Sequence, residues 1–355
     1  MRNKNNNDFN INLKNHQFKE IFPWIGGDLQ TIRDTFCFDL KRAKSVERIY
    51  IPIDGINNGP FKKNYLLGYL EVPKKDIYPK GLVFLTHGLG GSTKRFGLRR
   101  IAKELLHDGY AVFKLNLRGA GSGRYLTNSN YSARCSEDII TAINFLKNNY
   151  LLNNKRFNLD MKKIPIFGVG LSLGGTILLN ASLDYKNVNS LFDGIACVST
   201  PLDLHSSSQC IEKSRNYLYQ KWLIKRLKKQ LLMSEFSNKK ELFFKKIKSV
   251  KTIREFDETF TAPSWGYQSV NDYYSKASPL NKIKDGFYKL PFILLIHSKD
   301  DPWVPFEPTM NLKNNLGNQN KISILITEKG GHNGFHSAKG CWSDYVVKKW
   351  LNSLL

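Results

Sequence analysis

Short apolar runs alternate with longer amphipathic stretches along most of this chain. A run that is apolar throughout, such as residues 81–86 (GLVFLT), predicts a strand buried on both faces of a sheet. Residues 96–107 have helical spacing instead, with Ile101, Leu105 and Leu106 on one face. By these criteria the expected strands are 48–53, 65–72, 81–86, 111–116, 164–169, 194–199, 292–297 and 322–327, and the expected helices are 96–107, 136–150, 174 onward and 341–354.

Strands that alternate with helices predict an α/β fold, with a mostly parallel, doubly wound sheet of eight strands whose first two are antiparallel. Right-handed crossovers place helices on both faces of such a sheet. Residues from about 202 to 289 break the alternation, since they contain helical segments and no convincing strand. We interpret them as a helical cap insertion over the C-terminal edge of the sheet. The expected organisation is a flexible segment at 1–20, rich in Asn and Lys, and one domain at 21–355.

Residues 170–174 (GLSLG) match the pattern G-x-S-x-G. They follow an expected strand and precede a helix-compatible stretch, which is the context of the nucleophile elbow in α/β-hydrolases. Small residues flank the serine because the backbone is crowded in so sharp a turn. The helix N-terminus also favours developing negative charge. Ser172 is therefore the candidate nucleophile, and the alternative is a glycine-rich helix start that only packs on the sheet.

A serine hydroxyl is a weak nucleophile unless a general base activates it. In α/β-hydrolases the base is a histidine that follows the nucleophile and the acid in the chain. His332 lies in a glycine-flanked loop, 330–335 (GGHNGF), just after an expected strand, and such a loop can present an imidazole to the elbow. His332 is therefore the expected base. The other histidines after Ser172 have different expected roles: a less favoured base (His336), a structural residue (His297) and a site-lining residue of the cap (His205).

The acid is expected between the nucleophile and the base, in the segment 300–305 (DDPWVP) after the strand 292–297. A carboxylate there would orient His332 and stabilise its imidazolium. We expect Asp301 rather than Asp300, because Asp-x-x-Val-Pro is the usual loop shape in this fold. Asp300 would then cap or brace the loop.

Acyl transfer also requires N–H donors for the developing oxyanion. One expected donor is the backbone N–H of Leu173, the residue after the nucleophile. The other should come from the loop 87–91 (HGLGG), whose glycines let the backbone approach a reacting carbonyl. We expect the N–H of Leu89, with Gly90 as the rival. His87 precedes the nucleophile and is expected to brace this loop.

No metal or cofactor motif accompanies these residues. The segments 88–94 and 118–124 (RGAGSGR) do not match the Walker pattern, and no G-x-G-x-x-G opens a first βαβ unit. The five cysteines are far apart and form no CxxC pair, which argues against a zinc site and against a disulfide framework. We therefore expect no cofactor and no metal, and a reducing, cytoplasmic location.

The formal net charge of +24 is the one unusual property of the composition. Such a charge is typical of proteins that bind nucleic acid or anionic membrane surfaces. The lysines are spread over the whole chain, without an Arg cluster interleaved with aromatics, so we expect no nucleic-acid partner. A weak contact with an anionic membrane surface stays open. Residues 1–23 lack the apolar run of a signal peptide, and no stretch approaches the roughly 18 apolar residues of a membrane span.

From about Phe22 to its C-terminus the chain resembles the YheT-like branch of the α/β-hydrolases, also described as the AB-hydrolase 4 family. The similarity begins at residues 27–32 (GDLQTI), where Asp28 stands in place of the family's usual His. That branch includes mammalian α/β-hydrolase-domain lipases and yeast medium-chain ester enzymes. The other matching stretches are 87–92, 116–119, 131–138 (YSARCSED), 170–175, 198–204 (VSTPLDL), 254–263 (REFDETFTAP), 272–278 (DYYSKAS), 300–305 and 330–335.

The resemblance implies the triad Ser172, Asp301 and His332, and carboxylesterase or acylglycerol-lipase chemistry on short- to medium-chain esters without a cofactor. The expected reaction is a two-step acyl transfer on a small-molecule ester or lipid. An acyltransferase, in which an alcohol accepts the acyl group, would use the same residues. A non-catalytic binding protein on this fold would have a broken triad, and all three residues are present.

Overall fold

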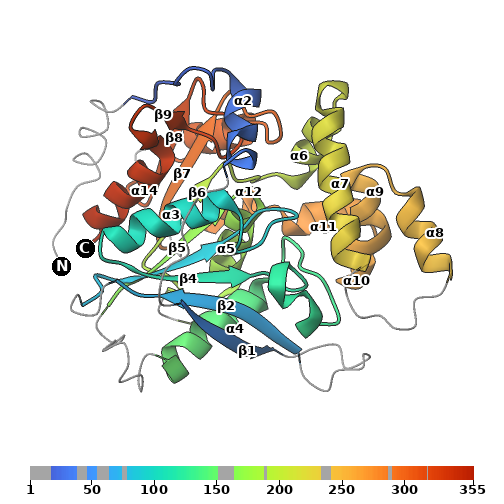
Figure 1. Cartoon of the computed structure of the whole chain (residues 1–355), viewed down its shortest axis with the longest axis horizontal. Helices are drawn as coiled ribbons and strands as arrows, with labels where there is room; N and C mark the ends of the chain where they lie inside the picture. Colours follow the sequence, from blue (N-terminus) through green and yellow to red (C-terminus); the bar gives the residue numbers. More distant parts are fainter. Residues whose placement is uncertain are drawn as a thin grey trace.

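A computed structural model describes residues 17–37, 46–53, 64–73, 78–150, 164–187, 190–232, 241–286, 290–317 and 319–355 (Figure 1). An eight-stranded sheet runs through its centre in the order β1-β2-β4-β3-β5-β6-β7-β8. β2 is antiparallel to both of its neighbours, and all the other pairs are parallel. The strands are β1 (Val46–Ile53), β2 (Asn64–Glu71), β3 (Leu82–Thr86), β4 (Ala111–Asn116), β5 (Ile166–Leu171), β6 (Gly194–Val198), β7 (Phe292–Ser298) and β8 (Ile322–Thr327).

Helices pack on both faces of this sheet, which confirms the predicted fold class (Figure 1). The helices are α2 (Gly27–Ile32), α3 (Phe96–His107), α4 (Ser136–Phe145), α5 (Leu173–Asp184), α6 (Leu204–Ile211), α7 (Tyr217–Leu232), α8 (Glu241–Ser249), α9 (Ile253–Phe256), α10 (Ala262–Ser264), α11 (Val270–Ala277), α12 (Leu280–Gly286), α13 (Glu307–Asn315) and α14 (Trp342–Ser353).

The alternation of side chains along β3 divides the core into two layers. Val83 and Leu85 point to one face, where they share a buried cluster with apolar residues of α3 and α14. Leu82 and Phe84 point to the other face and belong to a cluster that includes residues of α4 and α5. The central strands of the parallel part, such as β3 and β6, are therefore largely apolar because both of their faces are covered.

Most observed boundaries lie within one or two residues of the expected ones, and two of the differences have a clear structural description. β5 is Ile166–Leu171 rather than 164–169, because Pro165 has no N–H to donate and the strand runs on until the turn at Ser172. The single helix expected at 136–150 is instead α4 followed by a π-helical segment, Leu146–Tyr150.

Helices α6 to α12 lie between β6 and β7, and α7 to α11 extend to one side of the sheet (Figure 1). This is the stretch interpreted above as a cap, and its last three expected residues, 287–289, fall outside the described residues. It has an apolar core of its own, separate from the two clusters that cover the sheet. That core contains Ile211, Leu223, Ile224, Leu227, Leu231, Ile247, Val250, Ile253 and Phe256.

The flexible segment expected at 1–20 falls largely outside the described residues, so it stays a prediction. Within it, Phe18 packs against Phe335 and Trp342, at ring-centroid distances of 5.8 and 6.0 Å.

Among the helices of the described ranges, none combines the length and the apolar character needed to cross a bilayer.

A buried ion-pair cluster joins the short helical turn Arg33–Thr35, α3 and α14. The Arg100 guanidinium donates to both carboxylate oxygens of Asp344, at 2.7 and 3.3 Å, and also to Asp34. The side chains of Arg100 and Asp344 are 14% and 3% exposed. Loss of Asp344 would leave the buried Arg100 charge with Asp34 alone, and removal of one partner of a buried pair costs far more than the loss of an exposed pair.

We predict that Asp344→Ala lowers the free energy of unfolding by about 3 to 5 kcal/mol, as removal of one partner of a buried pair does. The matched control is Glu241→Ala, whose partner Lys245 lies at 2.9 Å on the surface with both side chains largely exposed. That change should cost less than about 1 kcal/mol. Urea denaturation of both variants measures the difference, and equal losses would contradict the assignment.

Candidate active site

Ser172 occupies the tight turn between β5 and α5. Its backbone angles, φ 54° and ψ −129°, are rare for a residue with a side chain and store strain. The turn is fixed by hydrogen bonds on both sides of the residue. The Ser172 N–H donates to Val198 O at 2.8 Å, and the Ser172 carbonyl accepts from the N–H of Gly175 and from Thr200 Oγ1, at 2.9 and 3.2 Å.

The glycines of the G-x-S-x-G motif are required by close backbone packing. A Cβ on Gly170 would lie 2.4 Å from Gly175 Cα, and one on Gly174 would lie 2.7 Å from Thr86 O. Neither contact can be relieved by moving a side chain. The turn that presents Ser172 therefore depends on the sequence pattern from which it was predicted.

The structure brings His332 to Ser172. His332 Nε2 lies 2.9 Å from Ser172 Oγ, and His332 Nδ1 lies 2.8 Å from Asp301 Oδ2. The His332 and Asp301 side chains are almost fully buried, at 3% and 0% exposure. This hydrogen-bonded series is the arrangement in which an imidazole activates a serine hydroxyl while a carboxylate fixes the imidazole tautomer.

The two candidate carboxylates have different partners. Asp301 Oδ1 accepts from the N–H groups of Trp303 and Val304, at 2.8 and 3.0 Å, while its other oxygen faces His332. Burial opposes ionisation of Asp301, but His332 and these hydrogen bonds lower its pKa below the ordinary value. Asp300 Oδ1 instead accepts from the Gly331 N–H at 2.9 Å, so Asp300 braces the loop that carries His332.

The three other histidines that follow Ser172 in the chain make no hydrogen bond to it. Burial lowers the pKa of His297, whose ring bonds to Val304 O and Thr309. Burial, with Arg100 and Arg33 nearby, lowers the pKa of His336 to about 2, so this ring is uncharged at neutral pH. His205 is exposed, bonds to Gln209, and is not among the residues that line the cavity described below, so its expected place in the site is wrong.

The loop after β3 lies against the elbow, as a Cβ on Gly88 would be 2.9 Å from Ser172 Cβ. His87 braces this loop from within. Its Nδ1 donates to Gly88 O at 2.9 Å, and its Nε2 accepts from the Leu117 N–H at 3.2 Å. Burial lowers the pKa of His87 to about 4.

The Gly90 N–H, the rival oxyanion donor, is taken by the Tyr131 hydroxyl at 2.7 Å. Gly91 N–H donates to Gly88 O and closes a turn in which Leu89 is the second residue. This hydrogen bond does not use the N–H of Leu89. Leu173 is the first residue of α5, so its N–H has no partner within the helix. The geometry favours the Leu89 and Leu173 amides as the donor pair.

Two residues in contact with His332 were not assigned a role from the sequence. The Trp303 ring stacks on the His332 ring, with centroids 4.5 Å apart and planes inclined by 27°. Thr31, on α2, accepts the His332 N–H on its Oγ1 at 2.8 Å. Both residues lie within stretches that carry the family resemblance, which was the available signal, but periodicity gave no reason to place α2 beside His332.

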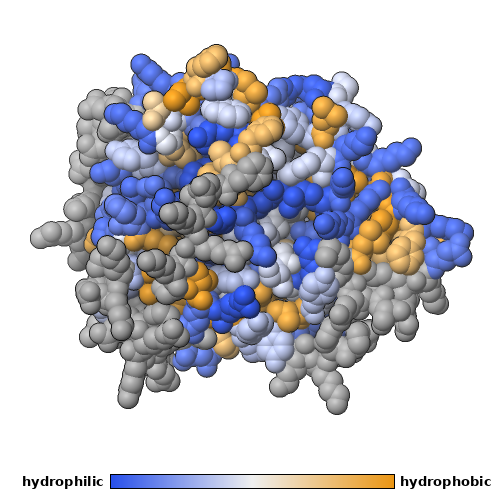
Figure 2. Space-filling view, viewed as in Figure 1, coloured by the Kyte–Doolittle hydropathy of each residue, from blue (hydrophilic) through white to orange (hydrophobic). Residues whose placement is uncertain are grey.

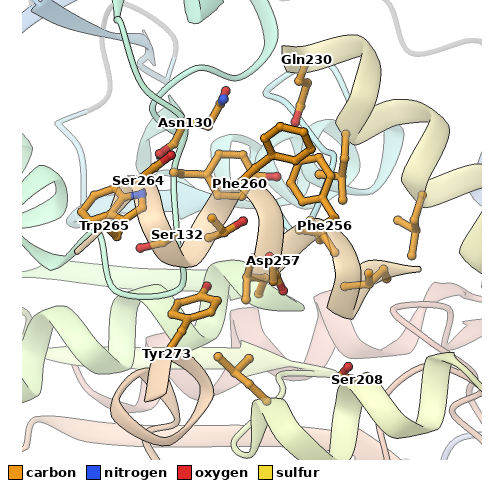
Figure 3. Close-up of a pocket in the computed structure, with 18 of the residues that line it drawn as sticks. Asn130, Ser132, Ser208, Gln230, Phe256, Asp257, Phe260, Ser264, Trp265 and Tyr273 are labelled. Carbon is orange, nitrogen blue, oxygen red and sulfur yellow. Dashed lines mark hydrogen bonds between the residues drawn. The ribbon is translucent and has the colours of Figure 1, made fainter. Parts of the chain in front are cut away.

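Ser172 and His332 line a cavity of about 370 Å³ together with the helices between β6 and β7. Figure 3 shows part of its wall. Its wall near the elbow includes Leu89 and Leu173. The region between β6 and β7 contributes ten large apolar side chains to the wall: Leu204, Ile211, Leu223, Leu227, Leu231, Phe243, Ile253, Phe256, Phe260 and Trp265. Such a wall suits a hydrocarbon chain.

One carboxylate, that of Asp257, is found among the described residues that line this cavity. Figure 3 shows it between Phe256 and Phe260 on one side and Tyr273 on the other. The Tyr274 hydroxyl donates to its Oδ2 at 2.9 Å. Burial raises the pKa of Asp257 from 3.8 to about 6, although hydrogen bonds from Thr261 and Tyr274 oppose the rise. The described residues contain no cluster of three or more metal-binding side chains.

A family model described as Hydrolase_4, serine aminopeptidase, S33, matches residues 78–337. A phospholipase ABHD3 from Homo sapiens is 27% identical over 292 residues, which are 79% of this chain and 66% of that protein. The putative esterase YheT of Escherichia coli is 28% identical over 299 residues, 81% of each chain. The predicted resemblance is thereby confirmed, and the chain spans about two thirds of the length of the phospholipase.

The fold is shared with solved esterase structures. The Pyrococcus furiosus esterase Pf2001 is 17% identical to this chain and superposes with a TM-score of 0.52, over 96% of this chain and 98% of that one. At that identity the likeness concerns the fold alone.

The raised pKa of Asp257 predicts a stability cost. The folded state holds the proton more tightly than an unfolded chain does, so the ionised carboxylate destabilises the fold above pH 6. Asp257→Asn should therefore raise the free energy of unfolding at pH 7.5 by up to about 3 kcal/mol. The gain should shrink as the pH falls from about 6 to 4, and urea denaturation at several pH values measures it.

Asp301→Asn supplies the opposite case. The pKa of Asp301 is lower in the folded state than in the unfolded chain, so ionisation of Asp301 stabilises the fold. This stabilisation is complete above the unfolded-state pKa and is lost as the pH falls from that value through the folded-state pKa. At pH 7.5 this variant should be less stable than the wild type.

The outcome that contradicts the first of these two predictions is equally clear. An Asp257→Asn protein that is less stable than the wild type at pH 7.5 would refute the interpretation of Asp257.

Proposed function

Because the chain belongs to the Hydrolase_4 family, we propose that it is a serine hydrolase that cleaves carboxylic esters, with Ser172, His332 and Asp301 as its catalytic triad. The observation that carries the proposal is the unbroken series of hydrogen bonds, at 2.9 and 2.8 Å, from Ser172 Oγ through His332 to Asp301. The names of the two relatives, a phospholipase and a putative esterase, favour ester over amide substrates.

The reaction would proceed in two steps. Ser172 Oγ attacks the ester carbonyl while His332 Nε2 takes its proton, and His332 then gives that proton to the departing alcohol. The Leu89 and Leu173 amides hold the oxyanion, and loss of one such donor typically costs about 3 to 4 kcal/mol of transition-state stabilisation. Water activated by His332 then releases the acid from Ser172.

The apolar cavity supports an aliphatic acyl chain, and its volume of about 370 Å³ lies at the low end of ligand pockets, which favours short- to medium-chain esters. The helices between β6 and β7 would act as the cap over this chain. Alcoholysis would use the same residues, because an alcohol in place of water accepts the acyl group in the second step. Product analysis with added ethanol separates the two reactions.

We expect the wild type to hydrolyse p-nitrophenyl esters between acetate and laurate, and Ser172→Ala to lower the turnover rate roughly 10⁴- to 10⁶-fold, as loss of a triad nucleophile does. The chain length at which activity is highest measures the usable length of the cavity. Activity that is retained in Ser172→Ala would refute Ser172 as the nucleophile.

The adjacent carboxylates provide a control within the same loop. Asp301→Asn should lower turnover about 10⁴-fold, because the imidazole loses the partner that fixes its tautomer. Asp300→Asn keeps an oxygen that accepts the Gly331 N–H, so its turnover should stay within about tenfold of the wild type. Equal losses in the two variants would contradict the assignment of the acid.

Contact with an anionic lipid surface has separate support. Exposed apolar side chains gather around α2 (Phe22, Ile25, Leu29 and Phe36) and at the start of α7 (Tyr217 and Leu218). The two groups are joined by the ion pair of Arg215 and Asp28, at 2.9 Å, and Figure 2 shows apolar surface over α2 and over the same end of α7. The net charge of +24 would add attraction to anionic lipid.

Sedimentation with vesicles tests this contact. The protein should bind vesicles that contain phosphatidylglycerol more tightly than pure phosphatidylcholine vesicles, and binding should weaken as salt is added. Leu218→Asp should lower the bound fraction severalfold. Leu355→Asp, at an exposed leucine remote from α2 in the sequence, should not. Equal binding by both variants, or by both kinds of vesicle, would exclude this surface.

A further inference from the structure

The cavity contains a polar cluster that the proposed acyl-transfer steps do not use. Asp257, Tyr274, Ser208 and Tyr273 come from three different segments of the cap region, and all four line the cavity. In Figure 3 the labelled members Asp257, Tyr273 and Ser208 lie among the apolar side chains of the wall. A purely hydrocarbon ligand would leave these polar groups without partners, which costs free energy.

Ser208 gives the strongest indication of a missing partner. The residue is 5% exposed, and its Oγ makes no hydrogen bond of normal geometry to any part of the chain that the structure describes. Its interaction with the Tyr274 oxygen falls short of hydrogen-bond geometry, and the Tyr274 hydroxyl itself donates to Asp257. Buried polar atoms are almost always paired in native proteins, so an unpaired hydroxyl on a cavity wall indicates that the cavity's occupant pairs with it.

Asp257 and Tyr273 also keep unused hydrogen-bonding capacity. A carboxylate offers about four acceptor positions, and the partners of Asp257 are the hydroxyls of Tyr274 and Thr261. The Tyr273 oxygen accepts the Ala133 N–H at 2.8 Å, which leaves its own proton free to be donated into the cavity. The cluster therefore offers both acceptors and donors to a single small polar group.

We propose that Asp257, Ser208 and Tyr273 form a subsite for an aliphatic hydroxyl group of the substrate. A hydroxyl both donates and accepts, so it can donate to the Asp257 carboxylate and accept from Ser208 or Tyr273. A cationic group fits the cluster less well, because the hydroxyls would gain no acceptor from it and because the protein's net charge of +24 opposes its approach.

The subsite also explains why an acid is kept in an apolar cavity at a cost in stability. A site built to hydrogen-bond a substrate hydroxyl rejects the analogue that lacks it, because the site's own polar groups then remain unpaired. The inference rests on the proposed ester hydrolysis and refines it: the natural ester carries a free hydroxyl on either its alcohol or its acyl chain.

Two pairs of esters with matched size test the subsite and separate these two sources. On the alcohol side, 2-hydroxyethyl octanoate is compared with propyl octanoate. On the acyl side, methyl 8-hydroxyoctanoate is compared with methyl nonanoate. In at least one pair the wild type should favour the hydroxylated ester by about tenfold or more in kcat/KM. No preference in either pair, or a larger one for methyl 8-aminooctanoate, would overturn the proposal.

The variants Ser208→Ala and Asp257→Asn should each reduce that preference to within about threefold of unity, by loss of activity on the hydroxylated ester. Cooperative urea unfolding of each variant shows that it folds, so a lost preference can be assigned to the missing polar group. Ser207→Ala is the matched control, since Ser207 also lines the cavity but its Oγ already donates to Asp203 O at 2.7 Å. A preference that survives in both variants would refute the subsite.

A failure of the proposed esterase activity can be told apart from a failure of the subsite. If no ester of either pair is cleaved, the esterase proposal fails, and binding decides the subsite by itself. Calorimetry with 1,8-octanediol and 1-nonanol should then show tighter binding of the diol to the wild type but not to Ser208→Ala. Equal binding of the two alcohols by the wild type would refute the subsite as well.

Discussion

The position of the loop that carries His332 is the constraint on which the rest of the site depends. Ser172 is fixed by its own tight turn, but His332 reaches it from a loop that neighbouring elements must hold. Gly331 donates to Asp300, His332 donates to Thr31, and Asn333 donates to Ser199 Oγ at 3.0 Å. Three backbone N–H groups in succession are thus held by three different segments, so the imidazole has little freedom to leave the line between Ser172 and Asp301.

Much of this architecture could be predicted from the sequence, because the local pattern and the spatial arrangement agree. Strands buried on both faces form nearly continuous apolar runs in the sequence. A tight turn with no room for a Cβ at Gly170 requires glycine there, so the turn is visible as a sequence motif. The roles of Thr31 and Trp303 could not be predicted, because their contacts with His332 depend on how distant segments pack. The raised pKa of Asp257 could not be predicted either, because it follows from burial in the folded protein and the residues next to Asp257 in the sequence do not indicate it.

The two buried carboxylates of the site show how environment separates residues of one type. Asp301 faces an imidazole and two backbone N–H groups, so its ionised form stabilises the fold. Asp257 faces hydroxyls and aromatic rings, and its ionised form opposes folding. Natural proteins accept such a cost where a side chain serves a ligand rather than the core.

Helix α2 lies near the beginning of the chain, yet Gln30 and Thr31 hydrogen-bond to the backbone around residues 332–336. The triad geometry is therefore closed by a contact between the two ends of the sequence. During synthesis α2 must wait until a segment 301 residues further along the chain has emerged before its partner exists. The region that the family model matches, 78–337, leaves this segment out. A fragment cut to those limits would keep all three residues of the proposed triad and lose the hydrogen bond from His332 N–H to Thr31.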